Sequence, residues 1–432
     1  MASESRPAVA RAIVMVTSSY PRFNGDAIGT FMEPIATGVA SRGFDVQLVA
    51  PWHPRWNRPP KDRGVTFHLY RYAPTDSLNI FGYAGAMRAD VGLRVSAFAV
   101  APLALAAGVV CTRQVTRRMH PAVVHAHWVI PGGVTGALAA GKTPLVISLH
   151  GSDVFVAEKY PIVRQAAAAA FRRAAWVTAC SEDLRLRAVS LGANRERSSV
   201  VPYGVDSDRF RPDESARARV RARFGLAPDA RLAFAFGRLV RKKGFEYLID
   251  AAALLAGGWP SLQVVIAGDG DLDGELRARA ASAGIADRVK FIGTVSQNDV
   301  PELLAGADVA VAPSVHDEAG NVDGLPNTVL EIMASGTPLV ATSVGGIGAV
   351  ALDGVTARLV EERSAAALAT AIADLLGRPG VRKTIGAEAR AMIARDHGWQ
   401  RVARDFEQIY REVAPALRGT TTTRPGATLA PN

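Results

Sequence analysis

Cysteine is scarce in this chain, which has only Cys111 and Cys180 among its 432 residues. Two cysteines cannot build the disulfide framework that stabilises small secreted domains, so we expect a reducing compartment and a cytoplasmic protein. A secretory leader is not indicated either, because the first apolar run, Ala12 to Val16, is shorter than the apolar region of such leaders. The sequence therefore predicts a globular protein of the cell interior.

Long hydrophobic runs are also lacking. The longest, Ala97 to Cys111, has 15 residues, contains Pro102 and falls in a helix that we predict over Gly82–Met119. A helix needs about 20 apolar residues to cross a membrane, so we expect a buried or interfacial helix here. With 49% hydrophobic and 21% charged residues, the chain has a globular composition. Its length predicts two or three domains.

Excess acid is lacking, and the positive charge is concentrated in the first half. Residues 1–204 hold 23 Lys and Arg against 12 Asp and Glu, whereas residues 205–432 hold 27 against 28. This asymmetry predicts an anionic partner for the first half, either a membrane surface or a phosphate-bearing acceptor. The alternative is that an Arg-rich composition inflates the count. Nucleic acid is not expected, because the Arg residues are scattered and no reader motif is visible.

The first half begins with a strand, a loop, a helix and a second strand. We expect the strands at Ala12–Thr17 and Asp45–Ala50 and the helix over Gly29–Ser41. This order is typical of a parallel, doubly wound sheet, in which ligands bind at the carboxyl ends of the strands. The loop after the first strand therefore faces the ligand, and Gly25 and Gly29 would let its backbone approach closely.

Three histidines fall on or just after two further strands. The predicted strands lie within Ala122–Trp128 and Leu145–Asp153, and they carry His125, His127 and His150. Without a cysteine or a pair of acids at ligand spacing, these histidines do not predict a metal site. We interpret His150, at the tip of its strand, as a residue of the ligand-binding edge.

The second half repeats the pattern, with a strand at Arg231–Phe236 that ends in a basic loop. Arg238 and Lys243 lie on this loop, at the carboxyl end of the strand. A guanidinium binds phosphate through two hydrogen bonds and an ammonium adds a point charge, so this pair would neutralise a diphosphate. We interpret Arg241 and Lys242, between them, as a solvated basic turn.

The segment Gly268–Gly274 superficially resembles a dinucleotide-binding fingerprint. Its third glycine comes one place late, and three Asp residues within it would repel a pyrophosphate. We interpret it as the turn of a strand–turn–helix crossover. An NAD-dependent oxidoreductase stays open as an alternative function, although no hydride-transfer site is visible.

The stretch from Pro313 to Gly346 carries the strongest signal in the chain. A strand at Asp308–Ala312 leads into an acidic, Gly-rich loop, and Pro326 begins a helix with an apolar face. The backbone amides of Asn327 and Thr328 have no partner within such a helix, and its start carries partial positive charge. This helix start therefore suits an anion such as a diphosphate.

Two acids frame this helix start, Asp323 before it and Glu331 inside it, with seven residues between them. A carboxylate accepts hydrogen bonds, and neighbouring sugar hydroxyls donate them. The stretch therefore offers a diphosphate site flanked by two groups that bind hydroxyls. A nucleotide-sugar presents that combination of groups.

This stretch resembles the signature of the family 4 retaining glycosyltransferases of GT-B fold, also described as glycosyl transferases group 1. In that signature an acid, seven residues and a Glu precede a small-residue helix, GTP and a GG loop. The matching residues are Asp323, Glu331, Gly336-Thr337-Pro338 and Gly345-Gly346. The family usually has Glu at the position of Asp323, and often a Glu where this chain has Gly348-Ala349.

The resemblance implies two doubly wound, Rossmann-like α/β domains that face a cleft. Residues 9–204 would form the acceptor-side domain and residues 205–395 the donor-binding domain. Residues 396–417 would form a helix that crosses back to the first domain. The Thr-, Pro- and Gly-rich residues 418–432 are expected to be a disordered tail.

The resemblance also implies an activity, the transfer of a hexose with retained configuration from a UDP- or GDP-sugar to an acceptor. The expected acceptor is a glycan or a lipid-linked glycan of surface polysaccharide or glycolipid biosynthesis, at the inner face of the cell membrane. No metal and no other cofactor are expected. The loop with Gly25 and Gly29 would lie near the donor diphosphate. A non-catalytic relative that only binds nucleotide-sugar is the other alternative.

Residue roles follow from the family's motif. The resemblance implies that His150, Asp323 and Glu331 are the catalytic residues. His150 would contact the donor sugar and support the reaction, Asp323 would bind hydroxyls of the transferred sugar, and Glu331 would bind the ribose. Arg238 and Lys243 would hold the diphosphate, together with the amides at the start of the helix after Pro326.

Overall fold

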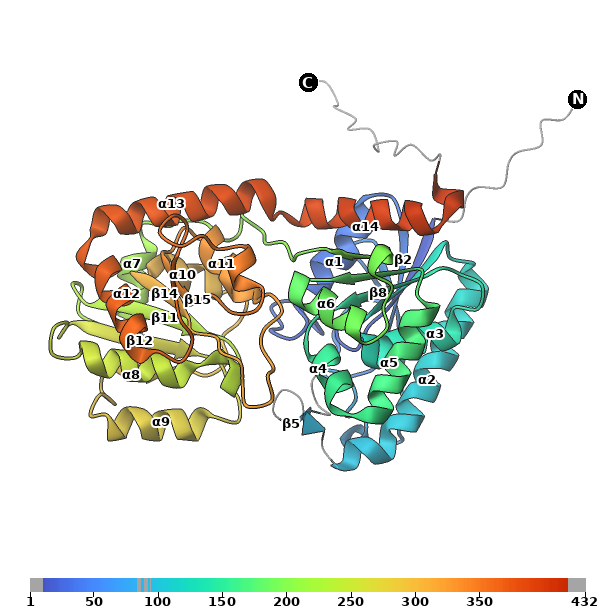
Figure 1. Cartoon of the computed structure of the whole chain (residues 1–432), viewed down its shortest axis with the longest axis horizontal. Coiled ribbons are helices and arrows are strands. Elements are labelled where there is room, and N and C mark those ends of the chain that lie inside the picture. The colour runs from blue at the N-terminus through green and yellow to red at the C-terminus, as the bar shows by residue number, and fades with distance from the viewer. Residues whose placement is uncertain (1–10, 84–86, 89–91, 94, 419–432) are drawn as a thin grey trace, which may run out of the picture.

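The computed structural model describes residues 11–83, 87–88, 92–93 and 95–418. The chain forms two α/β units, each built around a parallel sheet with helices packed on it (Figure 1). The expected fold class, two Rossmann-like domains, is confirmed.

The first unit contains an eight-stranded sheet in which only β3 and β4 pair antiparallel. Strands β1, β7 and β8 are buried along their whole length, as parallel strands between helical layers should be. From one edge to the other the strands are β10 (Ser198–Val200), β9 (Trp176–Ala179), β8 (Leu145–Leu149), β7 (Val123–His127), β1 (Ala12–Val16), β2 (Asp45–Pro51), β4 (Val65–Tyr70) and β3 (Lys61–Asp62).

The helices of the first unit follow the expected order, with two differences. A separate helix lies directly after β8, where only a loop was expected, and the long helix begins at Val95 rather than at Gly82. Gly82 and Tyr83 have φ angles of +99° and +54°, which a right-handed helix does not accommodate. The helices are α1 (Met32–Ser41), α2 (Val95–Met119), α3 (Val134–Ala139), α4 (Ser152–Lys159), α5 (Pro161–Arg173) and α6 (Glu182–Ser190).

Between Gly82 and Val95 the described residues include two short strands, β5 (Met87–Arg88) and β6 (Gly92–Leu93), which pair antiparallel. The prediction of helix over this stretch is therefore wrong there. Residues 84–86, 89–91 and 94 lie outside the described residues, as do residues 419–432 of the expected tail.

The second unit contains a six-stranded sheet that is parallel throughout. Its strands, in spatial order, are β13 (Val289–Phe291), β12 (Leu262–Ala267), β11 (Arg231–Phe236), β14 (Val309–Ala312), β15 (Leu339–Thr342) and β16 (Arg358–Val360). Its helices are α7 (Ala216–Phe224), α8 (Phe245–Leu255), α9 (Asp273–Ser282), α10 (Val300–Gly306), α11 (Asn327–Ala334), α12 (Ala365–Gly377) and α13 (Pro379–Asp396).

A last helix, α14 (Trp399–Val413), continues from α13 and runs along the first unit, where it packs on α1 (Figure 1). The chain thus passes between the units twice, and the two passages touch. The amide of Val205 donates to the carbonyl of His397 at 2.8 Å. A Cβ placed on Gly204 would lie 2.7 Å from the amide nitrogen of Trp399. Only glycine therefore fits at this crossing.

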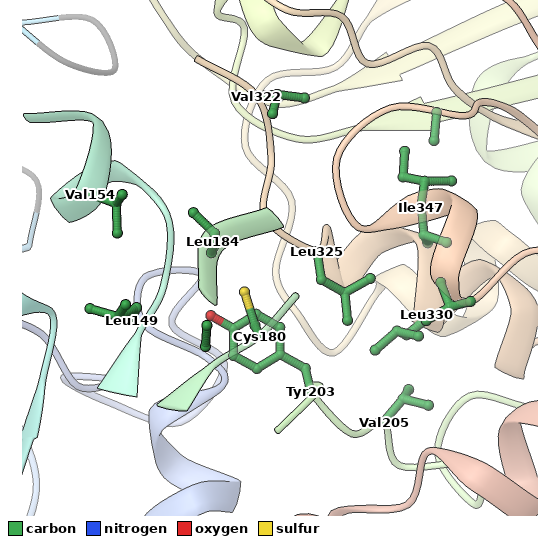
Figure 2. Packing of buried hydrophobic residues seen from close by; sticks show 14 of the residues in the cluster. Leu149, Val154, Cys180, Leu184, Tyr203, Val205, Val322, Leu325, Leu330 and Ile347 are labelled. Atoms are coloured by element: carbon green, nitrogen blue, oxygen red, sulfur yellow. The ribbon is translucent and has the colours of Figure 1, made fainter. Parts of the chain in front are cut away.

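One buried apolar cluster extends across both units. Leu149, Cys180 and Leu184 belong to the first unit, and Leu325 and Leu330 belong to the second (Figure 2). Because these side chains are buried together, the structure holds the end of the β14–α11 loop against the first unit.

Candidate active site

The start of α11 lies at the carboxyl ends of the strands of the second sheet. Pro326 has an extended backbone and is the N-cap, so α11 begins at Asn327, one residue after the predicted start. Thr328 lines a small pocket together with Lys243 and Ser314. The amides of this first turn have no intrahelical partners, so the pocket borders a site suited to an anion.

Close packing between backbones shapes the basic loop after β11. A Cβ on Gly268 would lie 1.8 Å from the carbonyl oxygen of Gly237, and one on Gly270 would lie 2.5 Å from that of Leu239. The glycines after β12 therefore permit contact between two loops, and the segment forms the predicted crossover between β12 and α9. These positions leave no room for a pyrophosphate against them.

Lys243 and Lys242 both bind Asp323. Nζ of Lys243 lies 2.6 Å from Oδ2 of this carboxylate, and Nζ of Lys242 lies 3.2 Å from Oδ1. The interpretation of Lys242 as solvated is wrong, because only 6% of this residue is exposed. Arg241 does point outward and pairs with Glu275 at 2.6 Å.

These two ammonium groups set the charge of Asp323. Burial alone would raise the pKa of its carboxyl, but Lys243 and Lys242 outweigh burial and hold this pKa well below its usual range. Asp323 is therefore ionised at neutral pH. The three side chains together carry one positive charge beside the start of α11.

The backbone at Asp323 and Gly324 is enclosed by glycines. A Cβ on Gly345 would lie 2.1 Å from the carbonyl oxygen of Asp323, and one on Gly346 would lie 2.0 Å from that of Gly324. The glycine pair of the sequence motif therefore allows the loop after β15 to pack on the loop before α11.

The same loop touches the first unit. A Cβ on Gly324 would lie 2.3 Å from Cδ1 of Leu184 and 3.0 Å from Sγ of Cys180. The amide of Gly324 also lies 3.9 Å from a Cβ placed on Gly151, which follows His150. The predicted donor-side acid and the predicted His150 loop are therefore neighbours across the boundary between the units.

His150 forms hydrogen bonds through both ring nitrogens. Nδ1 lies 2.6 Å from the hydroxyl of Tyr203, and Nε2 lies 3.1 Å from Nδ1 of His127. The hydroxyl of Tyr203 also lies beside the thiol of Cys180, which directly follows β9 and packs against Gly324 (Figure 2). A chain of polar groups thus links the strand ends of the first unit to the segment that joins the two units.

Burial determines the protonation of this chain. It lowers the pKa of His127 to about 3 and that of His150 well below its usual range, so both rings are neutral at pH 7. Nε2 of His127 is buried without a partner among the described groups. A buried ring nitrogen without a donor costs less free energy than a buried N–H without an acceptor, so the proton of His127 lies on Nδ1. His127 therefore donates to Nε2 of His150, and Nδ1 of His150 donates to the hydroxyl of Tyr203. The Tyr203 hydroxyl is then free to donate to Cys180.

Glu331 lies in the second turn of α11, with an exposed fraction of 9%. Burial raises the pKa of its carboxyl to about 8, and the charge of Arg209 offsets this only in part. At pH 7 the group is mostly protonated. A protonated carboxyl both donates and accepts, so it can pair with a hydroxyl in either sense.

The loop after β1 spans the boundary near the second unit. A Cβ on Gly25 would lie 3.0 Å from Oγ of Ser296, which follows β13, and one on Gly29 would lie 3.0 Å from Oγ of Ser19. Their φ angles are +83° and +67°, so both positions favour glycine for conformation as well as for space.

The predicted residues therefore fall into two groups. Lys243, Asp323 and Thr328 lie together around the start of α11, with the His150 loop beside them. Arg238 is exposed on the basic loop after β11. Among the described residues, no three His, Cys, Asp or Glu side chains are placed to hold a metal ion.

Sequence reasoning missed Lys242, Tyr203 and Cys180 as members of this site. Lys242 could have been found from its place in the same loop as Lys243, since adjacent lysines before a glycine can both turn inward. Nothing in the sequence near Tyr203 or Cys180 indicates that they meet across the sheet.

Two family profiles match the chain. The profile described as "Glycosyl transferases group 1" matches residues 216–392, and "Glycosyltransferase Family 4" matches residues 28–209. TuaC of Bacillus subtilis (strain 168), a glycosyltransferase named for teichuronic acid biosynthesis, is 31% identical over 83% of this chain and 88% of its own length.

Two further similarities extend the comparison. A GDP-mannose-dependent alpha-(1-6)-phosphatidylinositol monomannoside mannosyltransferase of Mycolicibacterium smegmatis is 34% identical over 62% of this chain and 71% of that protein. Among solved structures, Anabaena HepE in complex with UDP-glucose superposes with a TM-score of 0.72 at 20% identity, over 93% of this chain and 99% of HepE.

Proposed function

Because the chain belongs to the group 1, family 4 glycosyltransferases, we propose that it transfers a hexose from a nucleotide diphosphate sugar to a glycan or lipid-linked acceptor. The observation that carries the proposal is the cluster of Lys243, Lys242 and Asp323 at the bare start of α11. A diphosphate at that start would meet partial positive charge and an ammonium pair.

Each side chain has a proposed part in donor binding. Lys243 and the exposed Arg238 neutralise the diphosphate, and Thr328 and Asn327 offer backbone amides. Glu331 pairs with ribose hydroxyls through its mostly protonated carboxyl. These fixed groups supply the electrostatic stabilisation of a leaving diphosphate, so the proposal includes no metal ion.

The other side of the donor faces the transferred sugar. Asp323 accepts a hydrogen bond from a hydroxyl of that sugar. His150 contacts the sugar from the first unit, and a sugar hydroxyl then replaces His127 as the partner of Nε2. Gly25 and Gly29 bring the loop after β1 close to the diphosphate.

The proposed reaction retains the anomeric configuration. The bond from the anomeric carbon to the diphosphate oxygen breaks, and a bond from that carbon to the acceptor oxygen forms on the same face. The acceptor hydroxyl gives its proton to the departing diphosphate oxygen. The donor is a UDP- or GDP-sugar, which is supported by a relative named for GDP-mannose and by a fold neighbour solved with UDP-glucose.

A thermal-shift screen of nucleotide-sugars tests the donor. We expect one base and sugar to raise the unfolding temperature, and the pure protein to release nucleoside diphosphate from that donor when acceptor is added. Lys243→Ala and Arg238→Ala should each lower release by about 100-fold with the fold intact. Wild-type rates in both variants would overturn the diphosphate assignment.

Two other functions give different results in these assays. A relative that only binds nucleotide-sugar would show the thermal shift without hydrolysis or transfer. An NAD-dependent oxidoreductase would change NADH absorbance. The packing of Gly268 and Gly270 against the loop after β11 argues against the oxidoreductase, since it fills the space that a dinucleotide needs.

We also propose that the first unit docks on an anionic membrane, at the inner face of the cell membrane. Ala99–Met119, within α2, is long and apolar enough to span a membrane, and 33% of its apolar window is buried. Leu103 and Val110 on this helix are each 55% exposed, and Arg117 and Arg118 lie in its last turn. An exposed apolar face beside basic residues suits an interfacial site.

Vesicle sedimentation tests this docking. We expect binding to vesicles that contain phosphatidylglycerol, weaker binding in high salt, and little binding to neutral vesicles. Leu103→Gln combined with Val110→Gln should reduce binding, whereas Leu254→Gln, at an exposed site in the second unit, should not. Binding that does not change with lipid charge or with salt concentration would overturn the proposal.

A further inference from the structure

Four arginines surround one buried carboxylate at the amino ends of the strands of the second sheet. The candidate active site lies at the opposite, carboxyl ends of these strands. The carboxylate is Asp308, immediately before β14, with an exposed fraction of 3%. Its Oδ2 accepts from Nη2 of Arg221 at 2.6 Å and from the amide of Leu232 at 2.8 Å. This oxygen and the buried Arg221 are therefore satisfied within the fold.

The other oxygen of Asp308 is surrounded by three more guanidinium groups. Nη1 of Arg217 lies 2.5 Å from Oδ1, and Nη1 of Arg382 and of Arg231 lie 3.4 Å and 3.6 Å away. Three cationic side chains, from α7, β11 and α13, therefore converge on one carboxylate oxygen. This oxygen accepts a hydrogen bond from Arg217 alone among the three.

The positive charge in this cluster is not balanced. Burial lowers the pKa of the Arg382 guanidinium, and the charges of Arg231 and Arg217 lower it further. Among the described residues, Asp308 is the carboxylate that opposes them. Nη1 of Arg382 is buried and has no hydrogen-bond partner among the described groups. Like charges held this close destabilise one another unless a counter-charge joins them.

We propose that Arg217, Arg231 and Arg382 bind a phosphate-type oxyanion at this edge of the second unit. Their side chains are 38%, 33% and 19% exposed, so an ion can reach them from solvent. Guanidinium groups donate parallel hydrogen bonds that match the oxygens of a phosphate. The bound oxyanion neutralises the exposed parts of these guanidinium groups and joins α7 and β11 to α13.

This site is separate from the proposed donor site. Arg231 begins β11, whereas the basic loop with Arg238 and Lys243 follows the end of that strand. The length of β11 separates the two sites, which therefore lie at opposite ends of the strands. Binding at one can therefore be measured while the other is disabled.

Titration of the whole protein with inorganic phosphate, followed by calorimetry and thermal unfolding, tests the proposal. We expect saturable binding and a rise in unfolding temperature that potassium chloride of equal ionic strength does not reproduce. Arg382→Gln and Arg231→Gln should each weaken binding about tenfold. Arg395→Gln, which removes an exposed arginine from the same helix, should leave binding unchanged.

The donor site supplies the second comparison. Arg238→Gln should leave this phosphate binding in place, because that residue lies at the other edge. Loss of binding in Arg238→Gln with full binding in Arg382→Gln and Arg231→Gln would assign the phosphate to the donor site and overturn the proposal. A response that chloride reproduces would overturn it as well. The guanidinium of Arg231 donates no hydrogen bond within the described structure, so Arg231→Gln serves should Arg382→Gln fail to fold.

Discussion

The hydroxyl of Tyr203 lies 2.6 Å from Nδ1 of His150, and this contact ties the segment between the two units to the loop after β8. The two rings are also stacked, with an angle of 5° between their planes. Tyr203→Phe keeps the stacked ring and removes the acceptor of the His150 N–H. The imidazole then keeps the His127 N–H that donates to Nε2 but loses the acceptor that favours a proton on Nδ1.

We therefore expect Tyr203→Phe to lower kcat about tenfold while the KM for donor changes little, because the misplaced proton affects orientation rather than binding. Nitrogen NMR of histidine-labelled protein should show His150 protonated at Nδ1 in the natural protein and a mixture in the variant. Tyr72→Phe, which removes the hydroxyl of a half-buried tyrosine elsewhere in the first unit, is the control. An unchanged His150 spectrum in Tyr203→Phe would contradict this role for the hydroxyl.

Glu331 should make stability fall as pH rises. Its pKa is about 8 in the folded protein, against an ordinary value of 4.5. Between these values the folded state binds more protons than the unfolded state, so the free energy of unfolding decreases with increasing pH. The stabilisation is full below pH 4.5 and lost as pH passes 8.

Glu331→Gln removes this titration and keeps a neutral side chain of the same size. Urea unfolding at pH 5.5 and pH 8.5 should show a loss of a few kcal/mol for the natural protein that the variant does not share. The donor-binding role predicts in addition a raised KM for donor in Glu331→Ala. Equal pH dependence in both proteins would show that Glu331 does not titrate in this range.

Lys242 and Lys243 share one carboxylate, so removing one lysine and removing the carboxylate should have different costs in stability. Lys242→Met leaves Asp323 with one ammonium and should cost about 1–2 kcal/mol. Asp323→Asn leaves two buried ammonium groups without a carboxylate and should cost about 3 kcal/mol. Because the lysines lower the pKa of Asp323, this stabilisation is present above pH 3.8 and is lost as pH falls below it.

A double-mutant cycle of Lys242→Met and Asp323→Asn measures the coupling. We expect the two losses at pH 7 to be far from additive, and the coupling to shrink at pH 3. Additive losses would mean that Lys242 is buried for packing alone. Arg241→Met, one residue earlier and paired with Glu275 at the surface, should cost less than about 1 kcal/mol.

Several elements were predictable because local pattern alone determines them. The strand at Arg231–Phe236 and the helix at Trp399–Val413 begin and end where the apolar periodicity does. Ser181 is a residue type that commonly caps helices, and its hydroxyl accepts a hydrogen bond from the amide of Leu184 at the start of α6. The positions of the glycine motifs could also be identified from the sequence.

The reasons for those glycines were not predictable, because they lie in contacts between distant segments. Gly346 is required by the carbonyl of Gly324 and Gly204 by the backbone of Trp399. The inward turn of Lys242 likewise depends on where Asp323 sits, 81 positions later in the chain. Periodicity reports which face of an element is buried but not which partner buries it.

Gly346 provides the sharpest test of that packing. A Cβ there would lie 2.0 Å from the carbonyl oxygen of Gly324, so Gly346→Ala must push the Asp323–Gly324 segment away from the loop after β15. The displaced segment carries the carboxylate that binds Lys242 and Lys243. We therefore expect turnover to fall at least about 100-fold, with a loss of stability of about 1–3 kcal/mol.

Gly348→Ala is the matched control, since a Cβ there meets nothing closer than the carbonyl of Ser343 at 3.7 Å. It should keep both turnover and unfolding temperature. Donor-release kinetics and thermal unfolding of the two variants separate the possibilities. Equal activity in Gly346→Ala and Gly348→Ala would mean that the Asp323 segment tolerates displacement, and the geometry of the lysine–aspartate cluster would then not govern transfer.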